Sequence, residues 1–217
     1  MKDYLVLVNK HNAFNEEENE FQYIKDIPVL RGDNGKNTSS LEEKTYESFL
    51  QFQQAMKKKG IDVQINSAVR TVEDQIATEK EIYEEQLAKG KTEEEAKKYV
   101  AEYVAKPGYS EHHTGLAIDC RVRHIRQIPK RIYDNTFIRK TIIRLWNIQM
   151  MRIFRKALSD YGFIKRYDEK DFTTTGVHNE DWHIRFVGDK ETAKKIEKSG
   201  LCLEDYIEYT KKNEHTI

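Results

Sequence analysis

The stretch at residues 110–119 constrains the fold of this chain more than any other. It carries His112 and Asp119, and a second stretch at residues 180–185 carries His183. A catalytic zinc usually takes three protein ligands from His, Asp and Glu and keeps a fourth position for water. These three residues supply such a set, so the fold must bring two distant segments together.

The spacing inside the first stretch also requires a bend. His112 and Asp119 are an odd number of residues apart, so on one straight strand their side chains would point to opposite faces. Gly115 lies between them and is the position where the chain can turn. A hydrolase with one metal ion also needs a base that does not ligate the metal, and Glu180, one turn from His183, is the candidate.

These motifs resemble the VanY-type D-alanyl-D-alanine carboxypeptidases, a zinc peptidase family that also contains D-Ala-D-Ala dipeptidases and L,D-carboxypeptidases of peptidoglycan metabolism. The resemblance extends from Leu5 to about Tyr206. The segments that carry it are Ser110-x-His112-x-x-Gly115-x-Ala117-x-Asp119, Glu180-x-Trp182-His183-x-Arg185, Ser67-Ala68-Val69-Arg70 with Gln75, and Tyr161-Gly162-Phe163 with Thr175-Gly176.

The resemblance implies a zinc-dependent carboxypeptidase that removes the C-terminal D-Ala from peptidoglycan stem peptides or D-Ala-D-Ala-containing precursors. It implies Zn²⁺ held by His112, Asp119 and His183, with Glu180 as the base that acts on the zinc-bound water. Arg70 would stabilise the oxyanion that forms on the scissile carbonyl.

Further residues of the resemblance would bind the substrate. It implies that Ser67, Gln75 and Ser110 hold the terminal carboxylate and the neighbouring amide of the peptide. Ala68 and Val69 replace the family's usual Gly and Tyr, a change that reshapes the cleft wall.

Other functions stay open on the sequence alone. L,D-carboxypeptidases and D-Ala-D-Ala dipeptidases share the motifs. A cell-wall-binding module could keep the ligands without catalysis, although a structural zinc would not need Glu180. A metal-dependent amidase or a signalling-type domain on the same fold is a third possibility.

Two neighbours compete with the chosen residues. His113 is the rival of His112, and adjacent residues on an extended chain point apart, so we expect only one to face the metal. Asp181 is the rival of Asp119 and Glu180, and it stands where the family usually has Pro. Trp182 is expected to pack beside the ligand rather than to contact substrate.

Composition narrows the class of protein. The formal net charge is zero, which argues against nucleic-acid binding. Cys120 and Cys202 are too few and too far apart for a disulfide framework and are expected to be buried thiols. No stretch reaches the length of a membrane span, and residues 4–9 are too short for a signal peptide core. We therefore expect a cytoplasmic monomer, or a cell-envelope protein if a leader or anchor is missing.

Length and composition predict a single domain over residues 1–217, with a helical insert at about 72–105. Because strands and helices do not alternate strictly, the expected class is α+β with a small antiparallel sheet. The family resemblance implies that this sheet carries the zinc site and is flanked by helices, as in the hedgehog and D,D-peptidase folds. We expect strands at 4–9, 61–65, 116–123 and 182–187, an irregular loop at 10–37, and a helix from the capping boxes at Ser39 and Ser40 to Gly60.

Further helices are expected after Thr71 and Thr92, within the basic segment 121–155, and at about 192–198, with residues 201–203 closing the domain. The basic segment carries apolar residues at helical spacing as far as Leu158. It is interpreted as a core helix with a basic outer face, or as a surface for an anionic cell-wall polymer or a partner.

Overall fold

The computed structural model describes residues 2–18, 20–31, 37–125 and 136–214. Its strands are β1 (Tyr23–Pro28), β2 (Thr38–Glu42), β3 (Ile61–Ser67), β4 (Ala117–His124), β5 (Phe163–Tyr167) and β6 (Glu180–Phe186). Its α-helices are α1 (Glu43–Lys58), α2 (Val72–Ala88), α3 (Glu93–Tyr103), α5 (Thr136–Leu158), α6 (Phe172–Thr175), α7 (Lys190–Ser199) and α8 (Leu203–Glu214). Short 3-10 helices lie at η2 (Glu111–Thr114), η3 (Ser159–Tyr161) and η4 (Glu169–Asp171).

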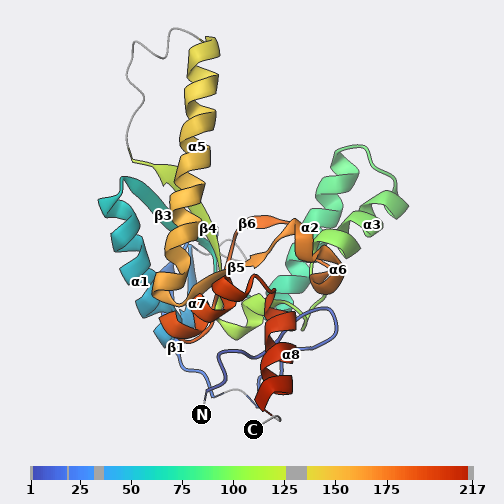
Figure 1. Ribbon diagram of the computed structural model, residues 1–217. Helices are drawn as coiled ribbons and strands as arrows, with labels where there is room; N and C mark the ends of the chain where they lie inside the picture. Colours follow the sequence, from blue (N-terminus) through green and yellow to red (C-terminus); the bar gives the residue numbers. More distant parts are fainter. Residues whose placement is uncertain (1, 19, 32–36, 126–135, 215–217) are drawn as a thin grey trace.

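The fold is α+β, as the sequence predicts. Four antiparallel strands form a sheet in the order β3-β4-β6-β5, and β1 and β2 form a separate two-stranded sheet. Helices α1 and α5 lie on one side of the main sheet, and the α2–α3 pair projects on the other side of the molecule (Figure 1). Helices therefore cover one face of the main sheet, and a functional site can form on the other face.

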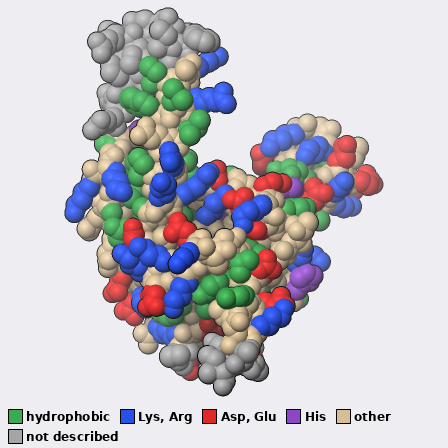
Figure 2. Space-filling model, viewed as in Figure 1, with side chains coloured by type: hydrophobic (Ala, Val, Ile, Leu, Met, Phe, Trp, Pro, Cys, Tyr) green, Lys and Arg blue, Asp and Glu red, His purple; other side chains and the backbone are tan. Residues whose placement is uncertain are grey.

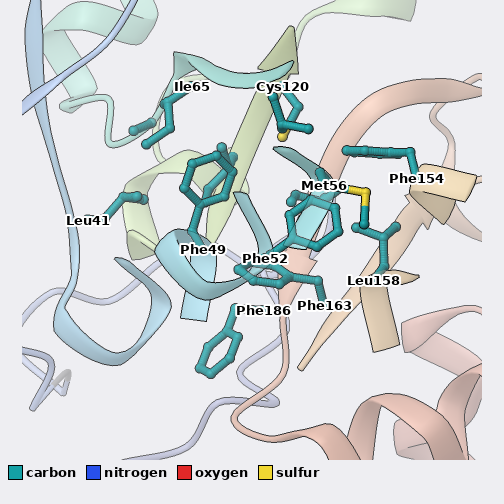
Figure 3. Packing of buried hydrophobic residues seen from close by; sticks show 14 of the residues in the cluster. Leu41, Phe49, Phe52, Met56, Ile65, Cys120, Phe154, Leu158, Phe163 and Phe186 are labelled. Atoms are coloured by element: carbon teal, nitrogen blue, oxygen red, sulfur yellow. The ribbon is translucent and has the colours of Figure 1, made fainter. Parts of the chain in front are cut away.

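The main core lies between the sheet and helices α1 and α5. Strand β3 alternates buried and partly exposed residues, which places Ile61, Val63 and Ile65 on the core face. Phe49 and Phe52 of α1 pack against the same cluster (Figure 3). A second cluster joins α7 and α8 to the edge strand β5.

Helix α5 fits the prediction of a core helix with a basic outer face only toward its C-terminal end, because Leu145 and Ile148 nearer its start are 59% and 58% exposed. Its buried residues include Met150 and Phe154, whereas Arg144 and Arg152 are exposed. Lys and Arg side chains are frequent over this helix in Figure 2, while the α2–α3 pair shows both signs of charge. Residues 126–135 of the basic segment lie outside the described residues. Among the described residues, no helix is both long and apolar enough to cross a membrane.

Several local predictions are confirmed. Thr71 and Thr92 each begin a helix with a complete capping box, with Asp74 and Glu95 as the reciprocal partners. The strand predicted at 61–65 is β3, the one at 116–123 is β4 and the one at 182–187 is β6. Both cysteines are buried thiols.

The N-terminal predictions are wrong in two places. Residues 4–9 do not form a strand, because Arg185 takes the carbonyls of Tyr4 and Val6, which a strand neighbour would otherwise use. The loop predicted at 10–37 contains β1, which pairs with β2. Ser39 and Ser40 belong to β2 and cap no helix; the carboxylate of Glu42 instead caps α1 by accepting from Thr45 N at 2.8 Å.

Two elements toward the C-terminal end differ from the sequence-based expectation. Strand β5 is one, and its short run includes two charged residues, so it lacks a clear alternating pattern. Helix α8 is the other, since residues 201–203 lead into a helix rather than closing the domain. The helix expected at 192–198 is present as α7.

Candidate functional site

The register of the main sheet places three polar residues side by side. Asp119 of β4 lies opposite His183 of β6 on one side and opposite Ser67 of β3 on the other. The neighbouring pair Ile118 and Ile184 points into the core, so the side chains of Asp119 and His183 point to the uncovered face.

Ser67 reaches this face because β3 is irregular at its end. Ile65 pairs with Cys120 and Ser67 pairs with Asp119, so Asn66 is an extra residue in β3. Such a bulge reverses the face on which the next side chain lies. It turns Ser67 away from the core face that Ile65 occupies.

His112 comes from a turn rather than from the sheet. It lies in the 3-10 helix η2, which ends at Gly115 with a φ of 69°, a value that disfavours residues with a side chain. A Cβ atom at Gly115 would lie 2.6 Å from Cε1 of Tyr23. The bend expected at Gly115 is therefore present, and the close approach of β1 and β2 also requires glycine there.

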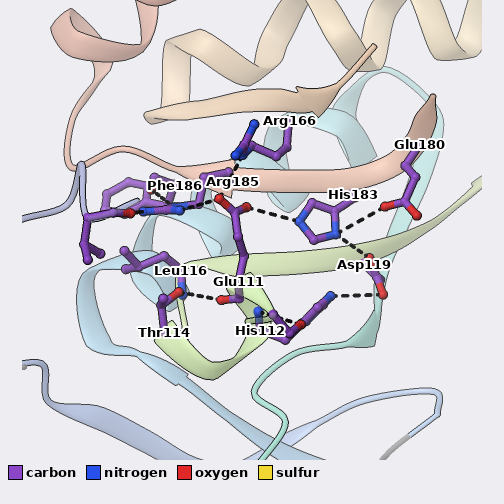
Figure 4. A network of polar contacts seen from close by, with 12 residues as sticks. Glu111, His112, Thr114, Leu116, Asp119, Arg166, Glu180, His183, Arg185 and Phe186 are labelled. Atoms are coloured by element: carbon purple, nitrogen blue, oxygen red, sulfur yellow. Dashed lines mark hydrogen bonds and ion pairs between the residues drawn. The ribbon is translucent and has the colours of Figure 1, made fainter. Parts of the chain in front are cut away.

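The three predicted ligands converge. Nδ1 of His112 contacts the Ala68 carbonyl at 2.6 Å, which directs Nε2 toward Oδ2 of Asp119 at 3.3 Å. Nδ1 of His183 lies 3.1 Å from Oδ1 of Asp119 (Figure 4). One atom from each residue lies within 4.8 Å of the others, and the donor set of two imidazoles and one carboxylate suits zinc.

Glu180 lies beside this cluster without being part of it. Its Oε2 is 3.7 Å from Nδ1 of His183. Burial raises the pKa of the Glu180 carboxyl above its ordinary value. A carboxylate with a raised pKa is a better proton acceptor near neutral pH.

Asp181 points to a different environment. Its carboxylate pairs with Arg155 at 2.6 Å and with Lys165 at 3.2 Å, so it joins α5 to strand β5. These partners lower the pKa of Asp181, against the effect of burial. Asp181, which replaces the family's usual Pro, therefore forms its own ion pairs with Arg155 and Lys165.

Arg70 lies where β3 leads into α2, at the edge of the cluster. Its Nη2 contacts Oδ2 of Asp119 at 2.9 Å, its Nε donates to Ser67 Oγ at 3.2 Å, and its Nη1 donates to Gln75 Oε1 at 3.4 Å. Gln75 in turn donates to the Ala105 carbonyl at 2.7 Å. Ser67 and Gln75 therefore hold Arg70 in place, a contact that the sequence analysis did not anticipate.

Ser110 and His113 shape the turn that carries His112. Ser110 is buried, and its hydroxyl accepts from the backbone N–H of His112 at 3.4 Å. His113 contacts the Arg70 carbonyl through Nδ1 at 2.7 Å and accepts from Gly108 N through Nε2 at 3.0 Å. Both ring nitrogens of His113 therefore contact the backbone, and His112 is the histidine that faces Asp119.

A buried carboxylate that the sequence did not predict, that of Glu111, lies behind the cluster. Oε1 of Glu111 accepts from Arg166 Nε at 2.8 Å and from Arg185 Nη1 at 2.7 Å, while Oε2 faces Nε2 of His183 at 3.5 Å (Figure 4). All of these groups are buried. No spacing rule links Glu111 to arginines that lie so far along the chain, so local sequence patterns contain no signal for this contact.

The cluster lies in an open cleft of about 1110 Å³. One wall comes from α2 and α3 and includes Gln75 and Tyr103, and another includes His178 and Trp182. Trp182 is 50% exposed, so the expectation that it packs beside the ligand is wrong. It lies on the strand that carries His183 and faces the cleft.

The charges around the two histidines differ. Burial and the nearby Arg70 lower the pKa of His112 to about 4. Burial also acts to lower the pKa of His183, but the carboxylates of Asp119 and Glu111 outweigh it and raise that pKa to about 9. In the metal-free protein at neutral pH, His183 is therefore protonated and His112 is neutral.

This difference predicts that zinc binding releases a proton. A ligating nitrogen must be unprotonated, so between pH 6.5 and about 9 a metal ion has to displace the proton of His183. The apparent zinc affinity should rise about tenfold for each pH unit over this range. Calorimetry at pH 7.5 in two buffers of different ionisation enthalpy should show at least one proton released per zinc, and the absence of release would contradict the assignment of His183.

A buried His–Asp–His cluster with a glutamate beside it, in an open cleft of an α+β domain, is the arrangement of mononuclear metallohydrolases. The sequence of residues 38–189 matches the family described as "VanY: D-alanyl-D-alanine carboxypeptidase". This chain belongs to that family.

The comparisons with individual proteins agree with the family. The chain is 35% identical over 153 residues to a D-alanyl-D-alanine carboxypeptidase of Enterococcus faecalis, a match that covers 70% of this chain and 50% of that relative. The chain thus spans half the length of that protein. It is 29% identical to the putative carboxypeptidase YodJ of Bacillus subtilis, over 94% of this chain and 81% of the relative.

Solved structures show the same fold. A mutant of the vancomycin resistance D,D-pentapeptidase VanY from a VanB-type cassette, in complex with Zn(II), has a TM-score of 0.71 at 29% identity and covers 95% of this chain and 99% of its own. VanYB in complex with D-alanine-D-alanine gives 0.70 at 29% identity, over 94% and 97% of the two chains. The LD-carboxypeptidase LdcB gives 0.64 at 26% identity, over 94% and 86%.

Proposed function

We propose that this chain is a zinc-dependent carboxypeptidase that removes the C-terminal D-alanine from peptidoglycan stem peptides or their precursors. The observation that carries the proposal is the convergence of His112, Asp119 and His183 within 4.8 Å, with Glu180 beside them in an open cleft. Relatives of the family that are named for this activity, and neighbours solved with Zn(II) and with D-alanine-D-alanine, support it.

His112, Asp119 and His183 would hold the zinc ion. When bound, the ion supplies Lewis acidity, which polarises a peptide carbonyl and lowers the pKa of a water molecule. Its ligand atoms would be Nε2 of His112, a carboxylate oxygen of Asp119 and Nδ1 of His183, because these atoms face one another.

The chain's own residues would do the rest of the chemistry. Glu180 would take a proton from the attacking water and deliver it to the amine of the departing D-alanine. Arg70 would stabilise the negative charge that develops on the carbonyl oxygen of the preceding residue. The Arg70 side chain is 17% exposed at the edge of the cluster, and Ser67 and Gln75 hold its guanidinium in place.

The substrate-binding roles of Ser67, Gln75 and Ser110 are part of the same proposal. All three line the cleft, where their polar groups could meet the terminal carboxylate and the adjacent amide. The cleft volume of about 1110 Å³ lies just above the range of roughly 300–1,000 Å³ for sites that hold drug-sized ligands. A cleft of this volume favours a stem peptide over a free dipeptide as substrate. The chain would be a single domain, and the insert at residues 72–105 would form one wall of the cleft.

The products decide between the related activities. Mass spectrometry should follow muropeptides that end in D-Ala-D-Ala, D-Ala-D-Ser or L-Lys-D-Ala, together with free D-Ala-D-Ala. We expect loss of one D-alanine from the first. Cleavage of the L-Lys-D-Ala end alone would assign an L,D-carboxypeptidase, and cleavage of the free dipeptide alone would assign a dipeptidase. Zinc binding without any cleavage would assign a binding module.

A further inference from the structure

Glu111 occupies a position that the roles above do not explain. It lies in η2 directly before His112, and its residue is 2% exposed. Oε1 accepts two hydrogen bonds from arginines, whereas Oε2 lies 3.5 Å from Nε2 of His183. Among the described residues, neither Oε2 of Glu111 nor Nε2 of His183 has a partner within hydrogen-bond distance and angle.

The two arginines keep this carboxylate charged and fixed. Arg166 is buried and donates its other two nitrogens to Glu204 of α8 at 2.8 and 2.7 Å. Arg185 is also buried and donates to the carbonyls of Tyr4 and Val6. Each arginine is therefore held on its far side by another part of the chain, and the pKa of Glu111 stays well below its ordinary value despite burial.

His183 has one ring nitrogen on each side of this arrangement. Nδ1 faces Asp119 and Glu180, in the cluster, and Nε2 faces Glu111, away from it. A ligating histidine coordinates through one nitrogen and usually donates the other N–H to a carboxylate or carbonyl, which fixes its tautomer and ring orientation.

We propose that Glu111 is a positioning residue for the metal site: it accepts the Nε2–H of His183 and so leaves the Nδ1 lone pair for the metal. The η2 turn then supplies one candidate ligand, His112, and its Glu111 orients a second one, His183. This inference rests on the proposed zinc site and names a residue that is not itself a ligand.

The alternative is that Glu111 is only a counter-ion for two buried arginines. The Glu111→Gln variant distinguishes the positioning role from the counter-ion role, because the glutamine side chain keeps the size of glutamate. Arginine has only donors, so the amide oxygen must stay toward Arg166 and Arg185, and the amide NH₂ must face His183. A donor there forces Nε2 to become an acceptor, which moves the proton of a neutral His183 to Nδ1, the atom that should bind metal.

The experiment is a zinc titration of the whole chain in competition with a chelating dye, between pH 6 and 9, so that proton competition is separated from coordination. Glu111→Gln should weaken zinc binding by about 10- to 100-fold. The matched control is Glu204→Gln, which removes a carboxylate charge from the same Arg166 but touches no histidine. It should bind zinc like the wild type. Equal affinity in Glu111→Gln and wild type, or equal losses in both variants, would overturn the inference.

A second measurement needs no folded variant at position 111. In the zinc-loaded wild type, ¹⁵N–¹H spectra of the imidazoles should show a proton on Nε2 of His183 and none on Nδ1. A proton on Nδ1 would overturn the inference even if Glu111→Gln does not fold. Neither result depends on D-alanine release, so a chain that binds zinc as described but cleaves nothing would contradict the proposed function alone.

Discussion

Glu180→Ala should keep its zinc and lose D-alanine release by roughly a hundredfold to ten-thousandfold, which is what removal of a positioned general base costs. Zinc is retained because Glu180 is not needed to complete the ligand set, and its Oε2 is 3.7 Å from Nδ1 of His183. The measurement is zinc content by metal analysis together with the rate of D-alanine release from a peptide that ends in D-Ala-D-Ala.

Asp181→Ala is the matched control, because it removes the adjacent carboxylate from the same strand. Asp181 pairs with Arg155 and Lys165 and not with the proposed zinc ligands, so turnover should stay near normal. Near-normal turnover in Glu180→Ala, with the loss appearing in Asp181→Ala instead, would transfer the role of base to Asp181.

The second large effect concerns the ligands. Asp119→Ala and His183→Ala should each lose both zinc and turnover, since either change leaves only two of the three protein ligands. Asp119 also contacts Arg70 at 2.9 Å, so its removal affects the group proposed to stabilise the oxyanion. His11→Ala, a change at an exposed histidine, should bind one zinc per chain. Full zinc occupancy in His183→Ala would refute the ligand assignment.

The convergence of the candidate ligands could be predicted from the sequence because their chemistry is concentrated in two short motifs. His112, Gly115 and Asp119 lie within a few residues, and the odd spacing alone indicates the bend that Gly115 provides. The structure adds the reason that His112 rather than His113 faces Asp119: both ring nitrogens of His113 contact the backbone.

Contacts between distant residues could not be predicted in this way. The pattern Ser39-x-x-Glu42 resembles a capping box, but pairing with β1 draws Ser39 into a strand and leaves Glu42 to cap α1. The apolar residues 4–9 likewise resemble a strand, yet a buried arginine binds their carbonyls. In both cases, tertiary partners outweigh a local preference.

Glu111 shows the same limit inside the site. Its motif position is visible in the sequence, but its role depends on Arg166 and Arg185, which β5 and β6 bring next to it. Strand β5 was not predicted, so the buried charge network around it was not predictable either. The bulge at Asn66, which turns Ser67 toward the cleft, also depends on pairing with β4.

The central claim is that one zinc ion in the His112, Asp119 and His183 cluster is required for release of D-alanine. The most direct test strips the protein of metal with a chelator, removes the chelator, and measures D-alanine release from a peptide ending in D-Ala-D-Ala as zinc is added back. The account predicts no release without metal and a rate that rises until one zinc is bound per chain. Undiminished release from the metal-free protein, or no release at full zinc occupancy, would contradict it.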